Sequence, residues 1–173
     1  MKKLILATAV VAASLLSISC KAADNVVLVT LDGLRWQEVF SGADKNLIDN
    51  TDFVANTDEL KALFWRDDQA QRTRALMPFF SETLAKQGVL IGDRTQGSFM
   101  SVINPWYFSY PGYSEILTGI VDENIDSNDK VPNPNKTILE SLNSQPEFKG
   151  KTALFGSWDV FPYIVNRERS GVY

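Results

Sequence analysis

The sequence contains no histidine and only one cysteine, Cys20. Without histidine, the chain offers neither an imidazole general base nor an imidazole metal ligand. A single cysteine excludes an intramolecular disulfide. The Gly-x-Ser-x-Gly sequence of a serine-hydrolase nucleophile elbow is also missing. Any serine that acts as a nucleophile here therefore needs another means of activation.

Positive charge is in the minority as well. Lys and Arg number 17 against 21 Asp and Glu, which gives the 173-residue chain a net charge of −4. Nucleic-acid binders need a basic face, so we expect no binding to nucleic acid. Hydrophobic residues make up 45% and aromatic residues 11% of the sequence. These values are typical of a packed globular protein, and the length suits one domain.

Residues 1–23 are predicted to be a signal peptide. Lys2 and Lys3 form a positive start, and an uncharged, mostly apolar run of 13 residues, Leu4 to Leu16, follows them. This run is too short for a membrane span and has the length of a signal-peptide core. Cleavage near Ala22 or Ala23 would remove three lysines and leave 14 basic against 21 acidic residues, a net charge of −7.

A second way of processing the leader stays open. The segment Leu16-Ser17-Ile18-Ser19-Cys20 resembles the box of a bacterial lipoprotein, although Ser17 stands where that box usually carries Leu. A lipid on Cys20 would anchor the protein to a membrane, whereas cleavage after it would discard this residue. In both cases we expect an exported protein, either periplasmic or secreted, or held as a membrane-anchored lipoprotein.

Apolar runs alternate with helical patterns over residues 24–173. Asn25 to Leu31 is rich in Val and Leu without alternation, which is typical of a strand buried on both faces of a parallel sheet. Further strands are predicted at 89–92, 98–103 and 151–155, and helices at 59–65, 77–87, 111–117 and 137–142. Strands separated by helices predict an α/β sandwich with a mostly parallel sheet.

Asp32 is the first candidate for chemistry. It directly follows the predicted strand at 25–31, at the edge where open α/β sheets bind ligands. The alternative is an Asp-Gly turn formed with Gly33, which is common after strands. From this feature alone, the turn is the favoured interpretation.

Ser109 is the second candidate. Pro111 suits the first turn of a helix, so Ser109 is expected at the helix N-terminus, where free N–H groups favour a phosphate or sulfate. A plain helix N-cap is the alternative role for this serine. Because no histidine can take its proton, activation would have to come from a metal ion, to which Asp32 could supply one ligand.

Together, these two segments resemble the alkaline phosphatase superfamily. Val29-Thr30-Leu31-Asp32-Gly33-Leu34-Arg35-Trp36 resembles its first metal-ligand strand, in the branch of nucleotide pyrophosphatases/phosphodiesterases and sulfatase-like proteins. Phe108-Ser109-Tyr110-Pro111-Gly112-Tyr113, with Leu117-Thr118-Gly119 after it, resembles the nucleophile segment.

The resemblance implies a three-layer alkaline-phosphatase-like sandwich. It makes Asp32 a metal ligand, and Ser109 both a metal ligand and the nucleophile that forms a covalent seryl intermediate. It also implies two divalent metal ions, usually zinc, and a small-molecule substrate that is a phosphomonoester, a phosphodiester or a sulfate ester.

The sequence also departs from this family. Its remaining metal ligands are Asp and His residues further downstream, and this chain has no histidine. Residues 24–173 are therefore interpreted as the N-terminal part of the catalytic domain, inactive by itself. The family places an oxyanion-binding asparagine after the nucleophile, for which Asn128 and Asn133 are both candidates. The alternative function is a non-catalytic exported binding protein or lipoprotein that keeps the fold without the metal site.

Aromatic residues gather at two further places. Trp106 and Tyr107 precede Ser109 and would either stack on an aromatic part of a substrate or wall the site. The segment Trp158 to Tyr163 could line a pocket, although core packing after a strand is the favoured interpretation.

Overall fold

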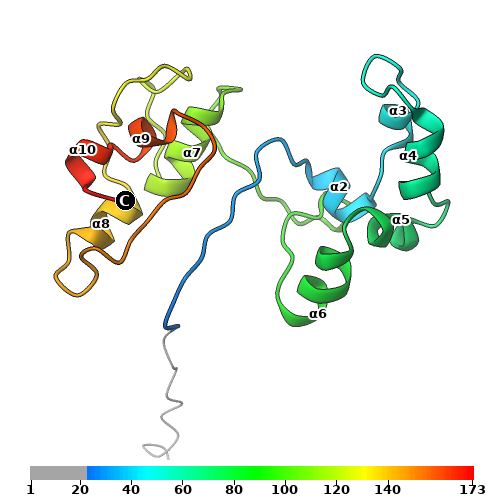
Figure 1. The fold of residues 1–173 in the computed structure, drawn as a ribbon, viewed down its shortest axis with the longest axis horizontal. Coiled ribbons are helices and arrows are strands. Elements are labelled where there is room, and N and C mark those ends of the chain that lie inside the picture. Colours follow the sequence, from blue (N-terminus) through cyan, green and yellow to red (C-terminus); the bar gives the residue numbers. More distant parts are fainter. Residues whose placement is uncertain (1–22) are drawn as a thin grey trace, which may run out of the picture. The chain divides into compact units, whose positions relative to one another are not determined.

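The structure, a computed structural model, describes residues 23–173 (Figure 1). The predicted signal sequence and the lipid site at Cys20 lie outside the described residues. No helix within residues 23–173 is long and apolar enough to cross a membrane. The chain divides after Leu31 into two units, and residues 32–173 form the second of them.

The predicted α/β sandwich is wrong for this structure. Over residues 23–173 the regular elements are all helices, and none of the four predicted strands forms. Their apolar side chains lie exposed instead: Val26 is 88% exposed, Val89 83% and Ile103 81%. Leu154 N donates to Tyr173 O at 2.8 Å without extending into a ladder. An apolar run becomes a strand only when a second segment pairs with its backbone, and residues 23–173 provide no such partner for these runs.

Residues 36–96 form one group of helices. They are α2 (Trp36–Ser41), α3 (Lys45–Ile48), α4 (Thr57–Phe64), α5 (Gln69–Leu76), the π-helix η1 (Phe79–Leu84), α6 (Ala85–Gln87) and the 3-10 helix η2 (Arg94–Gln96). Helix α5 contacts α2, α4 and η1. The helices predicted at 59–65 and 77–87 are thereby confirmed with shifted ends, the second one as η1 followed by α6. Helix α5 was not predicted, because its sequence QAQRTRAL has no apolar face.

Residues 109–173 hold the helices that bear on function. They are α7 (Ser109–Thr118), α8 (Ile138–Asn143), α9 (Phe161–Ile164) and α10 (Arg167–Ser170), and α7 contacts both α8 and α9 (Figure 1). The helices predicted at 111–117 and 137–142 are confirmed as α7 and α8. Gly119 ends α7 with a left-handed φ of 75°. Thr137 caps α8 by accepting from Glu140 N at 3.1 Å.

One face of α7 fixes its place in this group. Tyr110, Pro111, Ser114 and Leu117 are buried, and this spacing puts them on one side of the helix. Tyr110 and Leu117 belong to the core cluster together with Val160, Ile164 and Val165. The Tyr110 hydroxyl also donates to Val131 O at 2.7 Å. The first turn of α7, which carries Ser109, is therefore held firmly from one side.

Candidate active site

Ser109 is the first residue of α7, so its predicted position at a helix N-terminus is confirmed. The N-cap position belongs to Phe108, which has extended backbone angles and makes no side-chain cap. Ser109 itself is half-buried, and within residues 23–173 its hydroxyl makes no hydrogen bond. A plain capping role for this serine is therefore not what the structure shows.

The side chain of Asn128 caps α7 in place of a serine. Its Oδ1 accepts from Tyr110 N at 3.0 Å, across 18 residues of sequence. Pro111 has no N–H group, so the polar hydrogens left around the start of the helix come from Ser109 N–H, the Ser109 hydroxyl and Asn128 Nδ2. We call these three donors the anion site, because a helix N-terminus with free donors favours negative charge.

The hydrogen bonds of Asn133 exclude it as the asparagine that would bind a substrate oxyanion. It is fully buried, and its Nδ2 donates to Ser114 Oγ and to Ile164 O, both at 3.0 Å. Its Oδ1 accepts from Asn135 N at 2.9 Å. All its side-chain groups are engaged in holding the core. Of the two asparagines that the sequence left open, Asn128 is the one beside Ser109.

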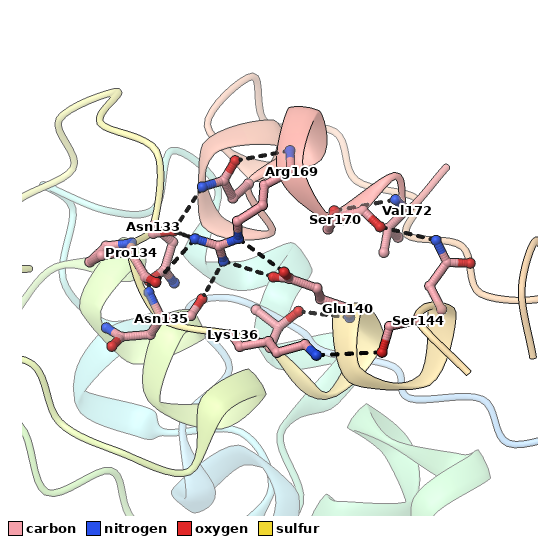
Figure 2. A network of polar contacts seen from close by, with 12 residues as sticks. Asn133, Pro134, Asn135, Lys136, Glu140, Ser144, Arg169, Ser170 and Val172 are labelled. Atoms are coloured by element: carbon pink, nitrogen blue, oxygen red, sulfur yellow. Dashed lines mark hydrogen bonds and ion pairs between the residues drawn. The ribbon is translucent and has the colours of Figure 1, made fainter. Parts of the chain in front are cut away.

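Arg169 holds the loop that follows Asn128 (Figure 2). Its Nε and Nη2 donate to the two carboxylate oxygens of Glu140 at 2.9 and 2.7 Å. Its Nη1 donates to Asn133 O and Pro134 O, both at 3.0 Å, and Nη2 donates to Asn135 O at 2.9 Å. Sequence reasoning missed this arginine, because no local pattern connects it to residues 29 to 36 positions earlier.

The carboxylate of Asp122 and the phenol of Tyr110 lie in the same region, but neither is suited to act as a general base. Hydrogen bonds from Asn135 Nδ2 at 2.6 Å and from Asn124 hold the pKa of Asp122 below its usual value. Burial, with a smaller contribution from the Asp122 charge, raises the pKa of Tyr110 to about 12. The Tyr110 hydroxyl therefore stays protonated at neutral pH, where it acts as a structural donor.

Asp32 is not brought into a cluster. It lies in an exposed turn with Gly33, whose φ is 75°, and among the described residues no hydrogen bond or ion pair joins it to Ser109. Over the same residues, no three His, Cys, Asp or Glu side chains gather that could hold a metal ion. Among the described residues, Asp32 therefore has the geometry of the Asp-Gly turn.

The two aromatic residues before Ser109 differ in their surroundings. The Tyr107 side chain is fully exposed. Trp106 is half-buried, and its Nε1 is buried with no acceptor among the described residues. Neither residue forms an aromatic stack in this part of the chain.

A serine–lysine pair is also ruled out as the source of activation. Ser127 and Lys130 have the Ser-x-x-Lys spacing, but Lys130 Nζ forms an ion pair with Asp159. The hydrogen bond to Asp159 raises the pKa of Lys130. A lysine that acts as a general base needs a lowered pKa, so this one is unsuited to the task.

Comparison with known proteins gives no relative: no family model, curated protein or solved structure matches this chain. The chemistry of the site is therefore argued from its own residues.

Proposed function

We propose that this chain carries the anion-binding and nucleophilic part of an exported phosphate- or sulfate-ester hydrolase, with Ser109 as the residue that forms the covalent intermediate. The observation that carries the proposal is the Asn128 carboxamide beside Ser109 at the start of α7. The resemblance of residues 29–36 and 108–119 to the alkaline phosphatase superfamily, which implies such an asparagine after the nucleophile, also supports it.

The three donors of the anion site suit an ester of phosphate or sulfate. Such a group carries non-bridging oxygens with negative charge, which Ser109 N–H and Asn128 Nδ2 would bind. The positive end of the α7 dipole favours the same charge. The Ser109 hydroxyl would then lie close to the phosphorus or sulfur atom. Its oxygen would form a bond to that atom as the bond to the ester oxygen breaks, and the hydroxyl proton would leave on the departing alcohol.

Activation of Ser109 needs more than the described residues supply. Within residues 23–173 no basic side chain hydrogen-bonds to its hydroxyl. The family resemblance assigns this task to two divalent ions, usually zinc, and of the ligands that it implies, this chain contains Asp32 and Ser109. We therefore expect the chain alone to bind zinc more weakly than about micromolar and to turn over slowly or not at all.

The test is covalent labelling of the native gene product that carries this chain. It is incubated with 4-nitrophenyl phosphate, bis(4-nitrophenyl) phosphate or 4-nitrophenyl sulfate, with and without added zinc. We expect nitrophenol release and, on acid quenching, one phosphoryl or sulfuryl group on Ser109 in the peptide mass spectrum. S109A should abolish both, whereas S101A, which changes an exposed serine outside the helix, should abolish neither.

Asn128 offers a sharper variant than alanine. N128D keeps an oxygen to accept from Tyr110 N, so α7 stays capped, but it loses the Nδ2 donor and adds a negative charge. We expect a native circular dichroism spectrum, with the rate of labelling of Ser109 reduced about 100- to 1,000-fold, the size of one lost oxyanion donor. Full turnover in S109A, or a label on another residue, would overturn the proposal. Tight ligand binding without label or turnover would instead indicate the non-catalytic binding protein.

A further inference from the structure

A cavity of about 510 Å³ lies beside the predicted aromatic segment. Its lining includes the apolar side chains of Trp158, Phe161 and Val165 and the charged residues Asp159 and Arg167. We call it the aromatic cavity. Its volume lies within the range of roughly 300–1,000 Å³ that small-molecule sites occupy. For residues 158–163 the sequence favours core packing over a pocket. In the structure Val160 lies in the core, and Trp158 and Phe161 both pack against the core and line this cavity.

The aromatic wall of this cavity is held in place from behind. The rings of Trp158 and Phe161 pack edge to face with centroids 6.1 Å apart, and Phe161 packs in the same way on Tyr113 of α7 at 5.0 Å. A Cβ atom on Gly156 would overlap with the Phe161 ring, so only glycine admits that ring here. A wall with fixed rings loses little side-chain entropy when a flat ligand packs against it.

The two charged side chains of the lining differ in their partners. Asp159, the one Asp or Glu in the lining, forms an ion pair with Lys130. The guanidinium of Arg167 makes no hydrogen bond or ion pair with any described residue. One positive charge is therefore left uncompensated next to the aromatic wall.

We propose that the aromatic cavity binds a small aromatic anion. The ligand ring would pack against Trp158 and Phe161, and its carboxylate would accept from Arg167, whose planar guanidinium matches a carboxylate with two parallel hydrogen bonds. This site is distinct from the chemistry proposed for Ser109 and does not depend on it.

The test uses two probes of nearly the same shape, one an anionic carboxylate and the other a neutral carboxamide. The full chain is titrated with 4-fluorobenzoate and with the neutral 4-fluorobenzamide, and binding is followed by fluorine NMR. We expect the benzoate to bind at least about tenfold more tightly, because a single charge-assisted hydrogen bond already has this effect and the guanidinium can donate two. R167Q should remove that preference. R74Q, which changes an arginine that pairs with Glu82 outside the lining, should keep it.

A second variant tests the aromatic wall. G156A should displace the Phe161 ring and weaken both probes alike, whereas G112A, at a glycine with open space around it, should weaken neither. The proposal is overturned if benzoate and benzamide bind equally, if R167Q keeps the preference, or if neither probe binds saturably. Should G156A fail to fold, the R167Q comparison decides alone, because this exposed arginine has no bonds to lose.

Discussion

Replacing Arg169 with methionine should destabilise the protein more than any other change of a charged residue in α10. Methionine keeps much of the apolar stem but removes all five hydrogen bonds that the guanidinium donates (Figure 2). The Glu140 side chain is left in place with 11% of its surface exposed. Its carboxylate then lies largely out of water without a cation.

The size of the stability loss follows from how deeply the Arg169 and Glu140 side chains of the ion pair are buried. Breaking a buried ion pair by removing one partner costs about 3–5 kcal/mol. The Arg169 side chain is 38% exposed, so in the variant water can partly take the place of the guanidinium beside Glu140. We therefore take the lower end of that range. We expect a loss of about 3 kcal/mol in the free energy of unfolding, out of the roughly 5–15 kcal/mol that natural domains possess.

Urea unfolding followed by far-UV circular dichroism measures this loss. R167M is the matched control, because Arg167 lies in the same helix and has no partner among the described residues. It should stay within about 0.5 kcal/mol of the unchanged protein. Adding E140Q to R169M should recover part of the loss, since the uncompensated charge is then gone. If R169M and R167M unfold at the same urea concentration, the reasoning about this network is wrong.

Three further changes test other parts of the fold by the same measurement. Burial raises the pKa of Tyr110 to about 12, so the stability contributed by its protonated hydroxyl is complete below about pH 10 and is lost as the pH rises towards 12. Y110F should therefore be less stable by about 1 kcal/mol near pH 8 and should lose less stability between about pH 10 and 12; parallel pH curves would contradict this. G42A should cost about 3 kcal/mol or more, because its Cβ would lie 2.6 Å from the Arg72 backbone carbon and its φ is 76°. G97A shares a positive φ of 71° but has open space, so a cost near 1 kcal/mol is expected, and equal costs would show that crowding is irrelevant. N133A leaves two buried groups, Ser114 Oγ and Ile164 O, and the partly buried Asn135 N–H without this partner and should cost about 3 kcal/mol; a cost below about 1 kcal/mol would mean that water enters the core.

The helices around the candidate site could be predicted because their signals are local. Pro111 suits a first turn, Gly119 takes up the left-handed backbone after the last one, and Thr137 caps the first turn of α8. Each signal acts within four residues of the helix end that it defines. The same argument explains why α9 and α10, each of four residues, carry too little pattern to be predicted.

The sheet could not be predicted correctly from comparable signals. The run at 25–31 has a strand-like composition, but composition describes only how a segment would pack if a partner were beside it. Pairing depends on residues far away in the sequence, and the described residues provide none for this run. The prediction failed at that step, where a local preference was taken for a long-range contact.

In the candidate site, too, local signals could be predicted from the sequence and long-range contacts could not. Ser109 could be located because Pro111 sets the start of α7 two residues away. Asn128 and Asn133 could not be told apart, because they are the same residue type in one loop. Which of them caps α7 is decided by contacts across long separations, such as the hydrogen bonds that Asn133 Nδ2 donates to Ile164 O and that Arg169 Nη1 donates to Asn133 O.

Both proposed sites depend on α7, yet each can fail without the other. Ser109 and Tyr113 are four residues apart and so lie on the same side of the helix, where Tyr113 supports the Phe161 ring of the aromatic cavity. N128D removes a donor from the anion site and touches nothing in the cavity lining. R167Q removes the cation of the cavity and leaves the cap of α7 intact. If either change altered both labelling and benzoate binding, α7 would have to shift as a whole, and the rigid support that its buried face implies would be refuted.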